Sequence, residues 1–177
     1  PTWITNEYAK TIVHKWRAEE QAILVGTNTA KQDNPSLTTR NWCGKNPLRV
    51  VLDQRLELPL DLKLFDKSAD TLIIAGEESK LLKKSNLPKN VGIEFVNYSL
   101  DFYTQLFKIL AQRNIQSLIV EGGEKVLTSF IQNDLWDEAR IFTGDVEFFE
   151  GVKAPYLNKK ENKFEIFGNS ILSFVRK

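Results

Sequence analysis

The chain has 177 residues, 42 % of them hydrophobic, which is enough to bury the core of one domain. Its 24 basic and 23 acidic residues leave a net charge of +1, a balance that gives no sign of nucleic-acid or membrane-surface binding. One cysteine and one histidine exclude an internal disulfide and an ordinary zinc site, no apolar run is long enough to span a membrane, and we expect a cytoplasmic protein without a bound metal.

Short apolar runs alternate with amphipathic stretches along the chain. Residues 6–20 are predicted to form a helix because Tyr8, Ile12 and Trp16 recur every four residues. Further helices are predicted over 77–85, 101–114 and 124–135, strands over 22–26, 48–53, 71–76, 92–98, 117–121 and 138–144, and a hairpin over 163–177 around Gly168 and Asn169.

This order of elements predicts an α/β fold. Strands that alternate with helices are typical of a central sheet that is parallel over most of its width and flanked by helices. The last strands follow one another without helices, so the C-terminal edge is predicted to be antiparallel. No internal repeat or linker interrupts the chain, and residues 1–177 are interpreted as a single domain.

Two strand ends share a pattern that suits ligand binding. In "AILVGTNTA" at 22–30 and "SLIVEGGEKV" at 117–126, glycine follows an apolar run. Open α/β sheets bind ligands at the carboxyl ends of strands, glycine lets a ligand approach the backbone, and a helix start attracts an anion. Two such corners can hold both ends of a dinucleotide, or a pyrophosphate and a second phosphate. Neither is the G-x-G-x-x-G fingerprint, and a Gly-Gly pair is also a common turn.

The stretch "TAKQDNPSLTTR" at 29–40 is predicted to contain a loop, because Pro35 disfavours helix at the residue before it. Loops that a rigid sheet positions often carry function, and this one holds Asp33 and Arg40. Asp33 can equally cap a turn, and Arg40 can be a solvated surface charge. His14 is expected to be partly buried or on the surface, and Cys43 has no base near it in sequence that would make it a nucleophile.

Four stretches, taken in order, resemble the reductase domain of the bifunctional riboflavin biosynthesis protein. They are "WITNEYAKTIVHKWRAEEQAILVGTNTAKQDNPSLTTR" at 3–40, "PLRVVLD" at 47–53, "LIVEGGEKVLTSF" at 118–130 and "DEARIF" at 137–142. The resemblance implies a dihydrofolate-reductase-like fold with NADPH as the cofactor. It also implies reduction of 5-amino-6-(5-phosphoribosylamino)uracil, in which a hydride reaches C1′ of the ribose and the ring opens to a ribityl chain.

The resemblance further implies roles for individual residues. It assigns catalytic roles to Asp33 and Glu121, with proton transfer near C1′ given to Asp33 and contact with the sugar or the pyrimidine to Glu121. It assigns the ribose phosphate to Arg17 and Arg40, since guanidinium groups bind phosphate well. The implied substrate-binding set is Thr5, Arg17, Asp33, Leu37, Arg40 and Glu121, and the implied cofactor-binding set is Gly26, Thr27, Thr29, Asp53, Gly122, Gly123 and Glu124.

In this family a zinc deaminase domain commonly precedes the reductase domain. The chain lacks the H-x-E and P-C-x-x-C signature of such deaminases, begins at Pro1 and contains no methionine. We therefore interpret it as an N-terminally truncated reductase domain whose full-length protein carries the deaminase, and we expect a homodimer. Two alternatives stay open: a pteridine or dihydrofolate-type reductase, and a catalytically incomplete NADPH-binding or oligomerisation module.

Overall fold

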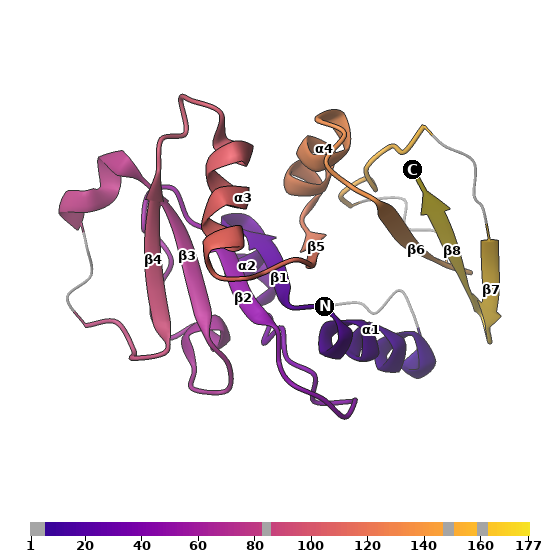
Figure 1. Ribbon diagram of the computed structural model, residues 1–177. Helices are drawn as coiled ribbons and strands as arrows, with labels where there is room; N and C mark the ends of the chain where they lie inside the picture. Colours follow the sequence, from indigo (N-terminus) through magenta and orange to yellow (C-terminus); the bar gives the residue numbers. More distant parts are fainter. Residues whose placement is uncertain (1–5, 83–85, 147–150, 159–162) are drawn as a thin grey trace.

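Most of the chain folds around a parallel sheet, which lies beside a smaller antiparallel sheet (Figure 1). The computed structural model describes residues 6–82, 86–146, 151–158 and 163–177. The helical elements are α1 (Glu7–Glu19), α2 (Thr27–Asp33), η1 (Lys63–Phe65), η2 (Glu77–Leu82), α3 (Phe102–Gln112) and α4 (Glu124–Gln132). The strands are β1 (Ala22–Gly26), β2 (Leu48–Leu52), β3 (Thr71–Gly76), β4 (Val91–Val96), β5 (Leu118–Gly122), β6 (Glu138–Gly144), β7 (Lys163–Phe167) and β8 (Ser170–Arg176). Among the described helices, none is long and apolar enough to cross a membrane.

The strand order places β1 and β5 side by side at the point where the chain changes direction across the sheet. The order is β4-β3-β2-β1-β5, so β2 to β4 extend outward from one side of β1 and β5 returns to its other side. Ala22 lies opposite Leu48 of β2 and opposite Leu118 of β5, both in parallel register. In open α/β sheets a ligand crevice forms at such a reversal, outside the carboxyl ends of the strands.

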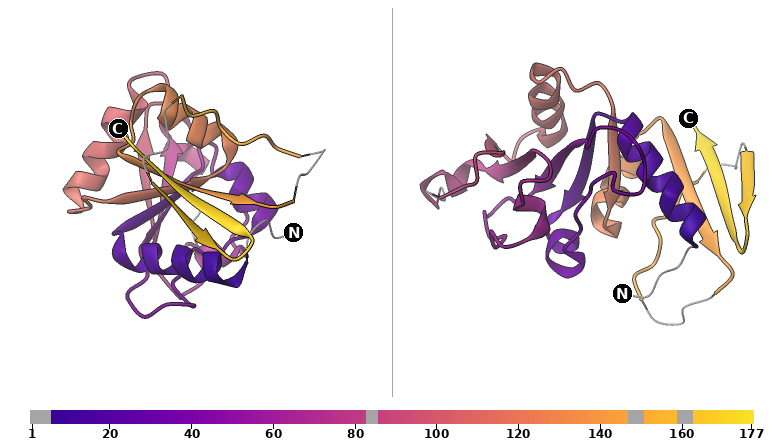
Figure 2. Two further views of the ribbon diagram at one scale, coloured as in Figure 1. Left: turned by 90° about the vertical axis from the view of Figure 1, so that its right-hand side faces the viewer. Right: turned by 90° about the horizontal axis from the view of Figure 1, so that it is seen from below.

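Both faces of the parallel sheet are covered, which explains why β1 is an unbroken apolar run. Successive strand residues point to opposite faces. Ile23 and Val25 pack with the α2 side of the sheet, whereas Leu24 packs with Leu106 of α3 and Phe130 of α4. Figure 2 shows these helices on either side of the sheet when the molecule is seen from below. A strand buried on both faces needs apolar residues at every position.

Helix α1 packs against the antiparallel sheet. Its first turn is capped by Asn6, whose side chain accepts the N–H of Ala9 at 3.0 Å. On the side facing the antiparallel sheet, the ring of Trp16 lies 5.6 Å from that of Phe142 in β6. The guanidinium of Arg140 lies 4.7 Å from the centre of the Trp16 ring, a cation–π contact. The small sheet therefore packs on α1.

The α/β fold class is confirmed, and the antiparallel strands have a sheet of their own. Their order is β6-β8-β7, with no pairing to the parallel sheet among the described residues. The predicted hairpin is confirmed, because Phe167 pairs with Ser170 across Gly168 and Asn169. Gly168 has φ 61°, as such a tight turn requires.

Two segments differ from their predicted structure. The part of 29–40 that precedes Asn34 is the end of helix α2, which stops where Asn34 takes a left-handed φ of 42° before Pro35. The predicted helix at 77–85 is a 3₁₀ turn over Glu77–Leu82, and residues 83–85 lie outside the described part. Its buried Ser79 donates to the carbonyl of Gln54 at 2.7 Å, and this tertiary contact holds the segment in the tighter turn.

Candidate active site

The two glycine corners predicted from the sequence pack directly against each other. Val25 of β1 lies opposite Gly122 of β5. A Cβ on Gly26 would come within 2.8 Å of Val126 Cγ2, and one on Gly123 within 2.8 Å of Thr29 Oγ1. These distances are too short for a side chain. The backbone at the switch point is therefore bare of side chains, because Val126 and Thr29 already occupy the space that a side chain would need.

Helix α4 begins at this bare corner. Gly123 is its N-cap residue, and no side chain caps the helix. The first N–H groups of such a helix suit an anion, because they lack helical partners and lie at the positive end of the helix dipole. The side chain of Glu124 is turned to its own helix, where Oε1 accepts from Thr128 Oγ1 at 3.1 Å. Any contact of Glu124 with a cofactor phosphate would be made by its backbone.

Thr27 and Thr29 of the predicted cofactor-binding set lie near this corner, whereas the carboxylate of Asp53 is engaged by backbone N–H groups of its own loop. Thr29 lies against the Gly-Gly pair, and Thr27 donates its hydroxyl to the carbonyl of Leu52 at the end of β2. Asp53 is buried, and its two carboxylate oxygens accept the N–H groups of Glu57 and Leu58, both at 3.0 Å. Asp53 closes a turn, and its role toward a cofactor stays a prediction.

An ion pair joins helix α1 to the carboxyl end of β5. Arg17 Nε donates to Glu121 Oε1 at 2.8 Å, and Arg17 Nη2 donates to Glu121 Oε2 at 2.6 Å. The third nitrogen, Nη1, donates to the carbonyl of Thr38 at 3.3 Å. The two side chains are only 12 % and 23 % exposed, so the pair is held in one geometry. Helix α1, strand β5 and the 34–47 loop meet at this one guanidinium.

The same cluster contains His14, a residue to which the sequence analysis gave no function. Its side chain is buried, and Nδ1 has no hydrogen-bond partner within the described part of the chain. Burial lowers its pKa, as do the positive charges of Arg17 and Arg40, while the Thr38 backbone and Glu121 act in the opposite direction. The sequence feature that could have identified His14 is its spacing from Arg17. Residues three apart share a helix face, and His14 precedes Arg17 by one turn.

The other predicted substrate residues differ in their exposure to solvent. Asp33 ends α2 with an exposed carboxylate that makes no hydrogen bond or ion pair within the described residues. Leu37, with φ 51°, is buried in the core on the face of the sheet that α2 covers. Arg40 is exposed and lines a hollow of about 600 Å³ with Thr11, Asn41, Trp42 and Cys43. Thr5 lies outside the described residues.

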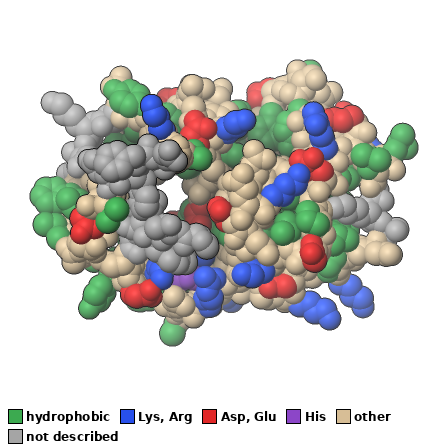
Figure 3. All heavy atoms as spheres, turned by 180° about the vertical axis from the view of Figure 1, so that it is seen from behind, with side chains coloured by type: hydrophobic (Ala, Val, Ile, Leu, Met, Phe, Trp, Pro, Cys, Tyr) green, Lys and Arg blue, Asp and Glu red, His purple; other side chains and the backbone are tan. Residues whose placement is uncertain are grey.

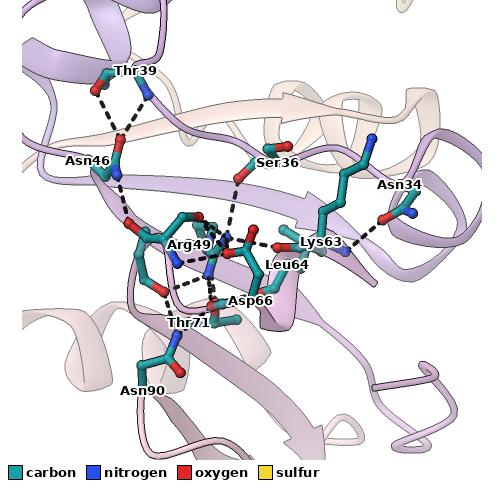
Figure 4. Close-up of polar contacts among 12 residues, drawn as sticks. Asn34, Ser36, Thr39, Asn46, Arg49, Lys63, Leu64, Asp66, Thr71 and Asn90 are labelled. Carbon is teal, nitrogen blue, oxygen red and sulfur yellow. Dashed lines mark hydrogen bonds and ion pairs between the residues drawn. The ribbon is translucent and has the colours of Figure 1, made fainter. Parts of the chain in front are cut away.

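The loop that carries these residues is anchored from behind by a buried arginine (Figure 4). Arg49 is fully buried and donates to the carbonyl of Ser36 at 3.4 Å and to the carbonyl of Lys63 at 3.0 Å. Asn46 adds a second anchor, since its Oδ1 accepts the N–H of Thr39 at 2.9 Å. Arg49 also binds Thr71 Oγ1, Asp66 Oδ1, the hydroxyl of Ser68 and the carbonyls of Asp66 and Ala69.

The surface seen from behind Figure 1 is hollowed (Figure 3). Acidic side chains lie inside the hollow, and basic side chains lie below it. Within the described residues no group of three His, Cys, Asp or Glu side chains could hold a metal ion. The chemistry that these side chains offer is charge pairing and proton transfer.

An open parallel sheet, a bare glycine corner at its switch point and an arginine–glutamate pair beside it define an α/β domain with a candidate ligand site at the carboxyl ends of its strands. The chain belongs to the RibD C-terminal domain family, whose model matches residues 1–148.

The chain spans about half the length of the longer relatives that it matches. It is 30% identical to the riboflavin biosynthesis protein RibD of Aquifex aeolicus, over 99% of this chain and 51% of that protein. It is 32% identical to a 2,5-diamino-6-ribosylamino-4(3H)-pyrimidinone 5′-phosphate reductase of Archaeoglobus fulgidus, over 81% of this chain and 70% of that protein.

A solved structure shares the fold over nearly the whole chain. It is a diaminohydroxyphosphoribosylaminopyrimidine deaminase/5-amino-6-(5-phosphoribosylamino)uracil reductase from Thermotoga maritima. The TM-score is 0.82 at 27% identity, over 99% of this chain and 50% of that one.

Proposed function

We propose that the chain is an NADPH-dependent reductase of riboflavin biosynthesis, which converts the ribosyl group of 5-amino-6-(5-phosphoribosylamino)uracil to ribityl. The observation that carries the proposal is the pairing of Arg17 with Glu121 immediately before the Gly122-Gly123 corner. Charged groups for a phosphorylated sugar and a bare backbone for a dinucleotide thus occur at one switch point.

The residues present fit a dinucleotide cofactor. The Gly123 backbone and the uncapped start of α4 would hold its pyrophosphate, with Thr29 beside them. A side chain at Gly26 or Gly123 would displace Val126 or Thr29 and so disturb the corner that the cofactor would meet. When bound, the nicotinamide supplies the hydride.

Arg40 and Arg17 would share the 5′-phosphate of the substrate unequally. Arg17 already uses Nε and Nη2 for Glu121, so only its remaining N–H groups are available for a ligand. Arg40 is exposed and carries no such commitment among the described residues. Arg40 is therefore the principal phosphate ligand, and Glu121 holds Arg17 in position as well as meeting the sugar.

Asp33 would move the proton that the reaction requires. Hydride adds to C1′ while the bond from C1′ to the ring oxygen breaks, and that oxygen must then take up a proton. Asp33 has an exposed carboxylate without an internal partner in the described part of the chain, so it is free to act. General acid–base assistance of this kind contributes roughly 10²–10⁴-fold.

Turnover tests the proposal directly. NADPH oxidation is followed by its absorbance with the phosphoribosyl-pyrimidine, with dihydrofolate in a parallel assay and with NADH in place of NADPH. We expect turnover with the first substrate and none with dihydrofolate. The Asp33→Asn variant should lose most turnover and keep its NADPH affinity. Normal turnover of this variant would remove Asp33 from the mechanism, and NADPH binding without turnover of any substrate would favour the incomplete cofactor-binding module.

A second pyrimidine is a specific alternative because of how one relative is named. The Archaeoglobus protein is named for the 2,5-diaminopyrimidinone, which carries an amino group at C2 where the uracil compound carries an oxygen. Comparing kcat/KM for the two compounds decides between them.

Further expectations belong to the same proposal. We propose that residues 1–177 act as one reductase unit in the cytoplasm, that the full-length protein carries a deaminase domain, and that the reductase unit forms a homodimer. The outward face of the antiparallel sheet supports the dimer, since Phe164, Ile166 and Ile171 are 63%, 67% and 43% exposed there. Sedimentation of the chain and of Ile166→Asp tests this, and an unchanged dimer in the variant would exclude this face.

A further inference from the structure

His14 is a buried polar group with one nitrogen left unused. Its side chain is 4 % exposed, and Nδ1 has no partner in the described part of the chain. Buried polar atoms in folded proteins are nearly always hydrogen-bonded, so an exception calls for an explanation. A neutral imidazole has one N–H and one lone pair, and an unused lone pair can accept a proton.

The charged groups around His14 come from three elements. Arg17 lies one turn along α1 and is paired with Glu121 near the end of β5, and Arg40 of the loop after α2 lines a hollow with Thr11, one turn before His14 on α1. Glu121 is already paired with Arg17, so the charge of Arg40 is the one left unbalanced within the described cluster. A proton on His14 would add a further positive charge to this group, which is unfavourable while no anion is bound.

A bound phosphate group changes this balance. A dianion at Arg40 and Arg17 supplies two negative charges, which offset the repulsion that these two guanidinium groups add to the effect of burial on the imidazole. An opposite charge within about 4–6 Å favours the charged form of a titrating group. We propose that His14 takes up a proton from solvent when a phosphate group binds at Arg17 and Arg40, so that the site gains a third cation together with its ligand.

This inference rests on the proposed function for one point, namely that Arg17 and Arg40 bind a phosphate group. It gives His14 a task beyond filling space. Because His14 also lies against Thr38 of the 34–47 loop, the new charge arises where that loop meets α1. His14 is thus a positioning residue that acts through the arginine pair.

The chain has one histidine, so its proton NMR signal reports His14 without ambiguity. The signal is titrated between about pH 4 and 9 in sodium chloride and in sodium sulfate of equal ionic strength. Sulfate is the probe because it stays a dianion over this range. We expect the titration midpoint to move to higher pH in sulfate. By linkage, sulfate should bind roughly tenfold more tightly on the acid side of the titration than on the alkaline side.

Two variants separate this behaviour from a structural role. Arg40→Gln should abolish the sulfate-dependent movement of the His14 midpoint. His14→Gln keeps a polar side chain of similar size but cannot titrate, so its sulfate affinity should no longer rise on acidification. Identical midpoints in chloride and sulfate, or an acid-dependent affinity that survives in His14→Gln, would overturn the proposal.

The result is independent of reductase turnover. If the midpoint of His14 moves in sulfate and the chain reduces no substrate, the inference about His14 is supported and the proposed function is refuted. A chain that reduces the phosphoribosyl-pyrimidine and shows no sulfate-linked movement would retain the function and lose the inference.

Discussion

The Arg17–Glu121 pair should contribute measurably to stability, unlike the surface pairs of the same protein. Two unit charges about 4 Å apart attract by about 4 kcal/mol at an effective dielectric constant of 20, before desolvation is subtracted. Exposed pairs retain about 0.2–1 kcal/mol, and breaking a fully buried pair costs about 3–5 kcal/mol. With side chains 12 % and 23 % exposed, the pair lies between these limits. We expect Arg17→Met or Glu121→Gln each to cost about 2 kcal/mol, which lowers Tm by about 4–8 °C for a domain of this size.

A double-mutant cycle isolates the interaction itself. Urea unfolding of the wild type, both single variants and the double variant is followed by circular dichroism, and the expected coupling energy is about 1–2 kcal/mol. Arg113 and Glu94 provide a matched control, because they form a pair whose side chains are both 40% exposed. The control cycle should give less than about 0.5 kcal/mol. A coupling no larger than that of the control would refute the claim that the site is braced by this pair.

Three further predictions follow from the same geometry. Gly123→Ala should weaken NADPH binding more than about tenfold, measured by nicotinamide fluorescence, because the new Cβ meets Thr29 Oγ1 at 2.8 Å; an unchanged Kd would contradict the bare-corner argument. Arg49→Met should lower the free energy of unfolding by about 3–5 kcal/mol in urea, since it removes every hydrogen bond of the buried guanidinium, including those to the Lys63 carbonyl and the Asp66 carboxylate, and a loss below about 1 kcal/mol would count against the anchor. Folding lowers the pKa of His14, chiefly through burial and then through two arginines, so the unfolded state binds the proton more tightly. Stability should therefore fall as pH drops below about 6.5, by at most about 1.4 kcal/mol per unit, and this contribution should vanish in His14→Gln.

Local signals in the sequence were enough to predict the elements that form the ligand edge. The apolar run of β1 and the glycine that ends it lie within a few residues of each other, and the same is true of β5. Because parallel strands bring their carboxyl ends to one edge, the two corners were expected on one sheet, where they can hold two parts of a ligand. Their direct contact, with Val25 opposite Gly122, follows from the strand order.

The polar contacts of the site could not be predicted, because they join distant segments. Arg17 and Glu121 are 104 residues apart, and helix position alone suggests a surface role for Arg17. Asp53 differs, because its oxygens accept from the N–H groups of Glu57 and Leu58, four and five residues further on, while its contact with a cofactor stays a prediction. The partner of Arg17 is set by tertiary packing, which no local pattern contains.

Under the proposed function, stability and ligand recognition are divided between two ends of one loop. The 34–39 part is fixed from behind by Arg49 and Asn46, while Arg40 emerges exposed at its end. A side chain that binds and releases a ligand needs to move, and it reaches the same position each time only if the backbone before it is fixed. Substitutions at Arg49 should therefore reduce stability first and substrate affinity second, whereas Arg40→Gln should reduce affinity with stability little changed. If both variants lost affinity and stability in the same proportion, the loop would be a single folding unit and the division of labour would be wrong.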